Sequence, residues 1–381
     1  MEWLKMFDDI RPYQDHEVKP AIERLVNHPR FKSVLNYLYE DAEVGELVAK
    51  FREIETIDQF QLFFSSYTVK KIIDKTSDGL TAHGFGNIDP AVPYLFVGNH
   101  RDIVLDAAIM QWLLNKYGHK TSQITFGENL MTEQLLLDMG KLNKMFTFFR
   151  GGSKMEQYQN ALNNSAYINH VIKVQKESIW IAQRNGRTKD GNDQTQKGLI
   201  KMFTVGNDDV INSLAELNIV PVTISYEIEP CEIQKVRELY IGRRQKYVKA
   251  PNEDYMSILA GITGDKGRIN YNFGTPLNDF IRSLGKEKLH TNELIERITM
   301  EIDRQIHQDY FLWPGNYMAF DMFKGTGEYR DLYSDEDLEK FESVMNARLR
   351  SLEGFDQAEL REMYLEMYAN PVVNRRALHP H

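Results

Sequence analysis

The residues best suited to chemistry lie in one short stretch, where an apolar run gives way to a turn. Tyr94–Val97 predicts a short buried strand, and His100 follows it after a Gly-Asn pair. Asp106, a little further on, is the only charged residue between Ile103 and Leu114. An ionised carboxylate among aliphatic side chains is unfavourable unless a partner bonds to it, and His100 is the nearest candidate. A carboxylate that holds an imidazole is the arrangement that a general base requires.

The sequence around this stretch predicts an α/β fold. From Gly79 onward, short apolar runs alternate with amphipathic stretches of helical length, which is the pattern of βαβ units around a mostly parallel central sheet flanked by helices. The predicted strands are Leu80–His83, Tyr94–Val97, Gln123–Phe126, Met145–Phe149, Ser178–Ala182, Ile219–Tyr226 and Arg268–Phe273. The predicted helices among them are Ile103–Lys116, Met131–Met139, Glu156–Gln175 and Gln196–Phe203.

Helical extensions are predicted on both sides of this region. We divide the chain into a helical N-terminal region (1–75), an α/β domain (76–283, with an insertion at 227–265) and a helical C-terminal region (284–381). In the first region, Phe60–Ile73 has a dense aromatic face, which favours packing against the α/β domain over contact with lipid. The C-terminal helices are predicted at Glu293–Gln308, Asp335–Leu349 and Asp356–Tyr368, with residues 370–381 frayed.

Composition limits the partners and the compartment. A net charge of −9 argues against a nucleic-acid binder, whose surface is usually basic. The single cysteine, Cys231, excludes an intrachain disulfide, fits a reducing compartment and is expected to be a small buried apolar residue. No window approaches 18 uninterrupted apolar residues, so we expect a cytoplasmic protein whose membrane contact, if any, is peripheral on the inner face.

The insertion at 227–265 carries a basic cluster in an otherwise acidic chain. A solvated face is the default interpretation of such a cluster. A docking surface for an acidic carrier protein or for anionic lipid head groups is the functional alternative. The cluster consists of Lys235, Arg237, Arg243, Arg244, Lys246 and Lys249.

Polar residues follow four of the predicted strands. Ligands of open parallel sheets bind beyond the carboxyl ends of the strands, and in a doubly wound sheet these ends share one edge. Arginine side chains suit phosphate or carboxylate, and backbone amides at Gly151 could bind an anion. Each residue alone could equally belong to a tight turn or an exposed surface, but together they favour an anion-binding cleft. The candidates for substrate binding are Asn99, Arg101, Glu128, Arg150, Gly151, Arg184, Asn185, Gly186 and Arg187.

Two other interpretations fail. His100-Arg101-Asp102 imitates the catalytic loop of protein kinases, but Ala107 stands where that loop has an asparagine. No His or Cys pair near these loops has the spacing of metal ligands, so we predict no metal and no bound cofactor.

The order of motifs resembles the glycerolipid acyltransferase superfamily over roughly residues 80 to 277. GFGNIDPAVPYLFVGNHRD is similar to that family's first block, FTFFRGG to the second, IAQRNGRTKDG to the third, IVPVTIS to the fourth and FGTPL to the terminal strand motif. The resemblance implies an α/β acyltransferase fold, a role in phospholipid biosynthesis, and an acyl carrier protein or CoA thioester as cosubstrate. It also implies that Arg150 meets the phosphate of the acceptor.

Two positions depart from the family pattern. The family leaves four residues between its His and its Asp, whereas five separate His100 from Asp106. Asp102 is the alternative partner, but it is well placed as a helix N-cap, so Asp106 is preferred. Asn185 stands where the family has a Glu, which leaves the identity of the acceptor open.

We therefore predict an O-acyltransferase of the 1-acyl-sn-glycerol-3-phosphate acyltransferase kind. His100 would take the proton of an acceptor hydroxyl, Asp106 would fix its tautomer, and backbone amides near the turn would stabilise the oxyanion. Arg150 and Arg187 would hold the anionic group of a phosphorylated glycerol or lyso-lipid, and Glu128 would touch a polar group. A lyso-aminolipid as acceptor is one alternative. A non-catalytic module that binds lipid or carrier protein on the same scaffold is the other.

Overall fold

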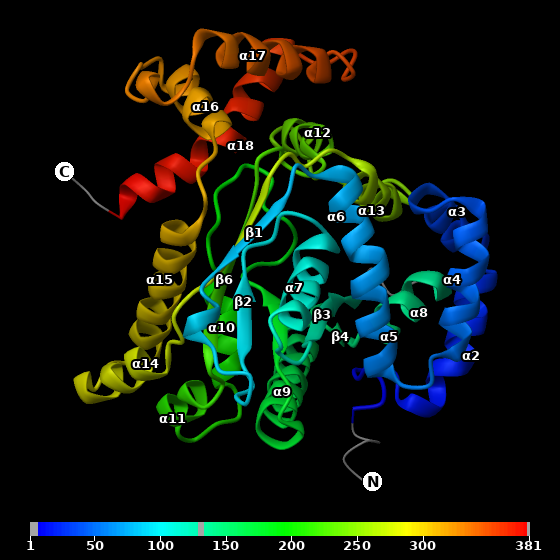
Figure 1. Cartoon of the computed structure of the whole chain (residues 1–381). Coiled ribbons are helices and arrows are strands. Elements are labelled where there is room, and N and C mark those ends of the chain that lie inside the picture. The colour runs from blue at the N-terminus through cyan, green and yellow to red at the C-terminus, as the bar shows by residue number, and fades with distance from the viewer. Residues whose placement is uncertain (1–6, 129–132, 379–381) are drawn as a thin grey trace.

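A seven-stranded sheet forms the centre of the computed structural model, which describes residues 7–128 and 133–378. The strand order is β1-β7-β6-β2-β5-β3-β4 (Figure 1). Among the described strands only β6 and β7 pair antiparallel. The strands are β1 (Leu80–His83), β2 (Leu95–Gly98), β3 (Gln123–Gly127), β4 (Met145–Phe148), β5 (Ile179–Ala182), β6 (Ile219–Tyr226) and β7 (Ile269–Phe273). The predicted strands and the mostly parallel sheet are confirmed, with strand ends shifted by one residue at most.

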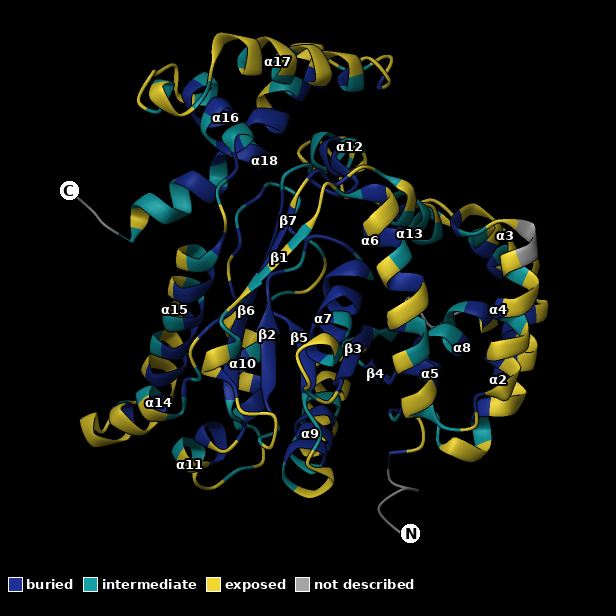
Figure 2. Ribbon diagram, in the orientation of Figure 1, coloured by how far each residue is buried: buried dark blue, intermediate teal, exposed yellow. Residues whose placement is uncertain are grey.

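Helices cover both faces of the sheet, because its central strands are apolar on both sides. Along β2, Leu95 and Val97 face one layer and Phe96 faces the other, as the alternation of a strand requires. The first layer contains α9 (Lys154–His170), α10 (Lys197–Thr204), α11 (Val210–Ala215), α14 (Asn278–Leu284) and α15 (Thr291–Asp309). The second contains α6 (Lys70–Thr76) and α7 (Leu105–Lys116). Figure 2 shows that β2 to β6 are buried between these layers.

The N-terminal helices form an apolar cluster beside the sheet (Figure 1). They are α2 (Asp15–Asn27), α3 (Pro29–Leu38), α4 (Asp41–Glu53) and α5 (Ile57–Phe64), and α8 (Gln134–Leu142) packs with them. The aromatic stretch Phe60–Ile73 packs inward: Phe60 and Ile72 are buried, and a π-helical turn, η1 (Ser65–Val69), joins α5 to α6. The predicted packing holds for these residues, whereas Leu62 and Tyr67 of the same stretch are exposed. The predicted helix Met131–Met139 begins at residues outside the described ranges, and α8 extends beyond its predicted end.

The C-terminal helices form a further layer, drawn at the top of Figure 1. They are α16 (Pro314–Lys324), α17 (Asp335–Leu349) and α18 (Gln357–Ala377), and α12 (Glu232–Gly242) packs against α18. The prediction that the chain frays after residue 369 is wrong, since α18 continues to Ala377. Asn370 donates to the Asp190 carbonyl at 2.7 Å, and Arg375 donates to the carbonyls of His307 and Tyr310. Residues 379–381 lie outside the described ranges.

Among the described residues, every helix is either too short or too polar to span a membrane.

Candidate active site

The carboxyl ends of β2, β5, β3 and β4 lie at one edge of the sheet. The strand register pairs Gly98 with Ala182 and Gly127 with Phe148, and all four strands run parallel. The polar residues predicted to follow these strands therefore emerge on the same side. The loops that carry them enclose a cleft of about 910 Å³, its open mouth included.

His100 and Asp106 meet at the head of this cleft. Nδ1 of His100 lies 3.0 Å from Oδ2 of Asp106, which belongs to the first turn of α7. The same oxygen accepts the backbone N–H groups of Arg101 at 2.6 Å and Asp102 at 2.9 Å. The other oxygen accepts the Tyr226 hydroxyl at 3.0 Å. These donors compensate the free-energy cost of burying the Asp106 carboxylate. The predicted contact between His100 and Asp106 is present, and the backbone of the turn also bonds to the carboxylate.

Tyr226 is held in its protonated, donating form. Burial raises the pKa of Tyr226, and the nearby charges of Asp106 and Asp102 raise it further. The phenol therefore donates to Asp106 across the whole physiological pH range.

Asp102 bonds to the start of α7, as its position before the predicted helix suggests. Its Oδ1 accepts the backbone N–H groups of Val104 at 2.9 Å and Leu105 at 2.8 Å, which caps the start of α7. The carboxyl group packs against Gly261, where an added Cβ would lie 2.2 Å from Oδ2. Asp102 as the partner of His100 is therefore corrected to Asp102 as a helix cap.

The remaining contacts of His100 come from β5 and the loop after it. The Trp180 ring meets the imidazole edge-to-face with ring centroids 5.8 Å apart, and the backbone N–H of Thr188 donates to the His100 carbonyl at 2.7 Å. Gly98 is required here, because a Cβ would lie 2.7 Å from Nε1 of Trp180. The His100 side chain remains 14% exposed and lines the cleft.

Three arginines line the cleft together with several apolar side chains. Arg150 donates to Oδ1 of Asn185 and stacks over the Phe148 ring at 4.7 Å. Burial lowers the pKa of Arg150, but the ordinary pKa of a guanidinium is so high that the group stays charged at neutral pH. Arg184 makes a long bond of 3.4 Å to the Asn192 carbonyl. Nη1 of Arg187 is buried with no hydrogen-bond partner among the described residues. Asn185 and Gly186 complete this side of the cleft.

Glu128 and Gly151 brace the loop that carries Arg150. Oε1 of Glu128 accepts the backbone N–H groups of Arg150 at 3.2 Å and Gly151 at 2.9 Å. The Gly151 amide is therefore already bonded to a carboxylate, and neither residue lines the cleft. The structure therefore gives both residues a role in holding the Arg150 loop, and their contact with substrate stays a prediction.

Asn99 and Arg101 are also misplaced as substrate ligands, since each is 1% exposed. Asn99 exchanges two hydrogen bonds with the backbone of Ile224, at 2.9 and 2.8 Å. The Arg101 guanidinium donates to Asp193 at 2.5 Å and Glu229 at 3.2 Å. Burial alone would lower the pKa of Arg101, but these acids raise it well above its ordinary value. Both residues fix the turn from inside the protein.

The backbone amides of the turn are likewise occupied. Those of Arg101 and Asp102 donate to Asp106, and those of Val104 and Leu105 donate to Asp102. These four groups cannot also bind an oxyanion, so the prediction that amides of this turn form an oxyanion hole is wrong for them. The arginine side chains are charged donors that line the cleft.

The basic cluster of the insertion is mostly paired with acids. Lys235 is 1% exposed and donates to Glu229 at 2.5 Å, so the solvated-face interpretation is wrong for it. The other pairs are Arg243 with Glu366, Arg244 with Glu359 and Lys249 with Asp254. The unpaired positive charge of the insertion is therefore smaller than the sequence indicates.

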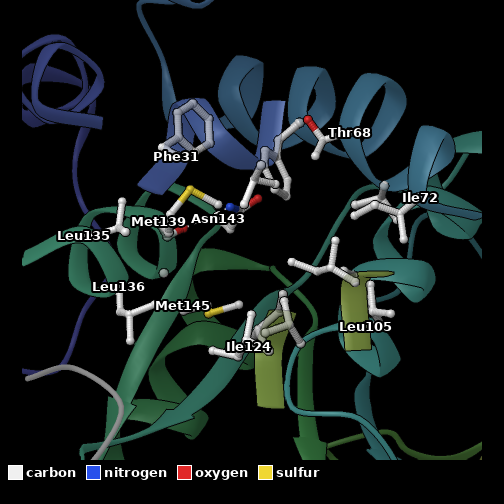
Figure 3. Close-up of a pocket in the computed structure, with 18 of the residues that line it drawn as sticks. Phe31, Thr68, Ile72, Leu105, Ile124, Leu135, Leu136, Met139, Asn143 and Met145 are labelled. Carbon is white, nitrogen blue, oxygen red and sulfur yellow. Dashed lines mark hydrogen bonds between the residues drawn. The ribbon is translucent and has the colours of Figure 1, made fainter. Parts of the chain in front are cut away.

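An apolar cavity of about 1090 Å³, its open mouth included, adjoins the cleft, and Figure 3 shows its lining. Ile124, Phe126 and Met145 line both spaces, so the edge of β3 and β4 separates them. In Figure 3, Ile124 and Met145 lie at one side of the cavity, and Phe31 and Thr68 lie at the other. The sequence did not reveal this cavity, because its walls come from α3, η1, α7, α8 and α13 (Glu253–Thr263), which are far apart along the chain.

Two of three comparisons with known proteins found no match: no protein-family model and no curated protein matches the chain. Among solved structures, the chain is similar to the crystal structure of the 1-acyl-sn-glycerophosphate (LPA) acyltransferase from Thermotoga maritima. The sequence identity is 12%, the match covers 77% of this chain and 96% of that chain, and the TM-score is 0.35. A likeness at this level says nothing about activity, so the case for a function comes from the geometry of the site.

Proposed function

We propose that the protein is an O-acyltransferase that moves a fatty acyl group from a thioester donor to the hydroxyl of an anionic acceptor. The donor would be an acyl carrier protein or CoA thioester, and the acceptor a phosphorylated glycerol or lyso-lipid. One observation carries the proposal: an imidazole backed by a buried carboxylate opens into a cleft with three arginines, and an apolar cavity shares a wall with that cleft.

His100 would act as the general base. Its Nδ1 is engaged by Asp106, which leaves Nε2 to take the proton from the acceptor hydroxyl. The acceptor oxygen then bonds to the thioester carbon, and collapse of the tetrahedral intermediate breaks the carbon–sulfur bond. The proton passes from the imidazolium to the departing thiolate. Asp106 stabilises the imidazolium between these two transfers.

The arginines favour an anionic acceptor. Arg150, Arg184 and Arg187 line the cleft, and their fork geometry matches phosphate or carboxylate oxygens. Positive charge there would also stabilise the oxyanion, since four backbone amides of the turn already have acceptors. A lyso-lipid acceptor resides at a membrane surface, so we propose that the protein makes peripheral contact with the membrane.

The apolar cavity would receive the fatty chain. Its surface comes almost entirely from aliphatic and aromatic side chains, so a hydrocarbon chain placed there leaves water at a gain of roughly 0.8 kcal/mol per buried methylene. In this proposal the thioester end of such a chain would lie at the shared wall, next to the cleft that His100 lines.

His100→Ala tests the proposal, with palmitoyl-CoA as donor and lysophosphatidate, a lyso-aminolipid and monoacylglycerol as acceptors. We expect the variant to lose about 10²- to 10⁴-fold in kcat while its thermal unfolding is unchanged. His119→Ala is the matched control, because His119 follows the far end of α7. Full activity of His100→Ala would overturn the proposal. Turnover of the lyso-aminolipid alone would redirect it to that acceptor, and saturable binding without turnover by the wild type would identify a non-catalytic lipid-binding module.

A further inference from the structure

Four charged side chains form a buried network next to the His100 turn. Arg101 donates to Glu229 and Asp193, and Lys235 of the insertion donates to Glu229. All four side chains are at most 4% exposed, and the two cations balance the two acids. A buried set of charges is tolerated only when its members satisfy one another in one geometry, so the network resists displacement of any member.

The backbone of Arg101 is bonded at both its carbonyl and its N–H, and the first of these bonds comes from the network. Nζ of Lys235 donates to the Arg101 carbonyl oxygen at 2.6 Å. The Arg101 N–H donates to Oδ2 of Asp106, the atom that faces His100. The position of Lys235 is thus transmitted through one residue to the carboxylate that orients the imidazole.

The C-terminal helix α18 supports both acids of the network. The backbone N–H of Glu229 donates to the Tyr368 hydroxyl at 2.9 Å. On the other side, α18 packs so closely on the loop of Asp193 that a Cβ at Gly191 would lie 2.0 Å from the Met367 carbonyl oxygen. The Gly191 carbonyl itself accepts from Arg101 at 3.3 Å.

We infer that Lys235 and Tyr368 are positioning residues, through which the C-terminal helical layer fixes the geometry of His100 and Asp106. Neither residue lines the cleft, so both would act on the orientation of the base and not on substrate binding. The inference rests on the proposed function for its kinetic consequence, but its geometric consequence is independent of any activity.

Tyr364 supplies a matched control for Tyr368. Both hydroxyls donate to Oε2 of Glu232, Tyr364 at 2.8 Å and Tyr368 at 2.5 Å, and both side chains belong to α18. Tyr368 additionally accepts the backbone N–H of Glu229, whereas the other neighbours of the Tyr364 hydroxyl, Tyr368 and Arg348, belong to the C-terminal helices. Tyr368→Phe and Tyr364→Phe therefore each remove one bond to Glu232, and only the first also removes the bond to Glu229 of the network.

The experiment compares these two variants and Lys235→Met with the wild type. Lys246→Met, an exposed lysine of the same insertion, is the control for Lys235→Met. The first readout is the Nδ1–H signal of His100 in ¹⁵N-histidine-labelled protein, assigned by its disappearance in His100→Ala. The second is kcat and KM with palmitoyl-CoA and lysophosphatidate.

We expect Lys235→Met to shift the His100 signal and to lower kcat by about 10- to 100-fold with little change in KM, as misorientation of a base predicts. Tyr368→Phe should cause a smaller change of the same kind, about 3-fold or more in kcat, and Tyr364→Phe and Lys246→Met should cause less than about 2-fold. Equal effects of Tyr368→Phe and Tyr364→Phe on the signal would overturn the inference, even if Lys235→Met failed to fold. An unmoved His100 signal in Lys235→Met would overturn it as well. Wild-type inactivity would count against the proposed function, while the signal would still decide the positioning role.

Discussion

Tyr226 donates its hydroxyl to Oδ1 of Asp106 at 3.0 Å, while His100 faces Oδ2 of the same carboxylate. The two oxygens of Asp106 therefore serve separate purposes. Oδ1 is tied to the end of β6, and Oδ2 gathers the imidazole and two backbone amides of the turn. A carboxylate held at both oxygens cannot rotate, so the orientation of His100 is set by the sheet as well as by α7.

Asp106→Asn tests whether both oxygens of the Asp106 side chain must accept hydrogen bonds. The amide can accept at one atom only, and its NH₂ group would oppose either the Tyr226 hydroxyl or the backbone donors. We expect kcat to fall by about 10³-fold and the free energy of unfolding to fall by roughly 2 kcal/mol. Steady-state kinetics and urea unfolding measure the two effects.

Tyr226→Phe is the control for that change. It removes one hydrogen bond at Oδ1, so we expect a loss of about 1 kcal/mol in stability and less than about 10-fold in kcat. If Tyr226→Phe reduced kcat as strongly as Asp106→Asn, the assignment of His100 to Oδ2 would be wrong.

Asn185→Asp should weaken the binding of an anionic acceptor. The Arg150 guanidinium already donates to Oδ1 of Asn185, and a carboxylate at that position would neutralise it. We expect KM for lysophosphatidate to rise about 10-fold, equivalent to roughly 1.4 kcal/mol, with kcat nearly unchanged. The measurement is acceptor saturation at fixed palmitoyl-CoA.

The uncharged monoacylglycerol and Asn185→Ala provide the controls. The KM for monoacylglycerol should not respond to Asn185→Asp, and Asn185→Ala should leave the KM for lysophosphatidate within about 2-fold. An equal rise in KM for both acceptors would show that Arg150 does not bind the anion.

The strands and the His100–Asp106 contact were predictable because each depends on short-range sequence. Apolar runs such as Ile219–Tyr226 are buried on both faces of the mostly parallel sheet and therefore lack the alternation of an exposed strand. The contact followed from one physical cost, that of an unpaired carboxylate in an apolar helix.

The inward orientation of Arg101 was not predictable in the same way. Its partners Asp193 and Glu229 lie about 90 and 130 residues further along the chain, in loops with no periodic pattern. The prediction that residues 370–381 are frayed was wrong for a similar reason. Pro371 and the basic residues near the C-terminus suggest fraying, but long-range bonds from Asn370 and Arg375 hold the helix in place.

The apolar cavity leads to a prediction about donor chain length. Thr68 is buried at its wall, and its hydroxyl has no hydrogen-bond partner among the described residues. Thr68→Phe would fill part of the cavity, so we expect kcat/KM for palmitoyl-CoA to fall about 10-fold relative to octanoyl-CoA. Competition between the two donors, analysed by mass spectrometry of the products, measures the ratio.

Thr68→Val is the matched control, since it keeps the shape and removes only the hydroxyl. The ratio of the two donors should stay within about 2-fold of the wild-type value. A Thr68→Phe enzyme that retained its preference for palmitoyl-CoA would place the fatty chain elsewhere.

The stability of the protein should depend on pH through Lys266, a buried lysine next to the cap of α7. Burial lowers the pKa of Lys266 from 10.5 to about 8, although the Asp102 charge raises it in part. Its Nζ donates to the Thr76 hydroxyl at 2.8 Å and to the Gly264 carbonyl at 2.6 Å. Between these two pKa values the unfolded chain binds a proton that the folded protein does not hold.

The free energy of unfolding must therefore rise with pH in that window, because stability increases with pH wherever the unfolded state binds more protons. Relative to Lys266→Met, the wild type should gain up to roughly 3 kcal/mol between pH 8 and pH 10.5, and the difference should be flat below pH 7. Urea unfolding of both proteins across this range measures the difference in the free energy of unfolding.

Subtracting one protein from the other cancels the contribution of the tyrosines, which titrate in both proteins alike. Lys246→Met, which replaces an exposed lysine, should show no such slope, and a flat difference for Lys266→Met would mean that Lys266 keeps its charge in the folded protein.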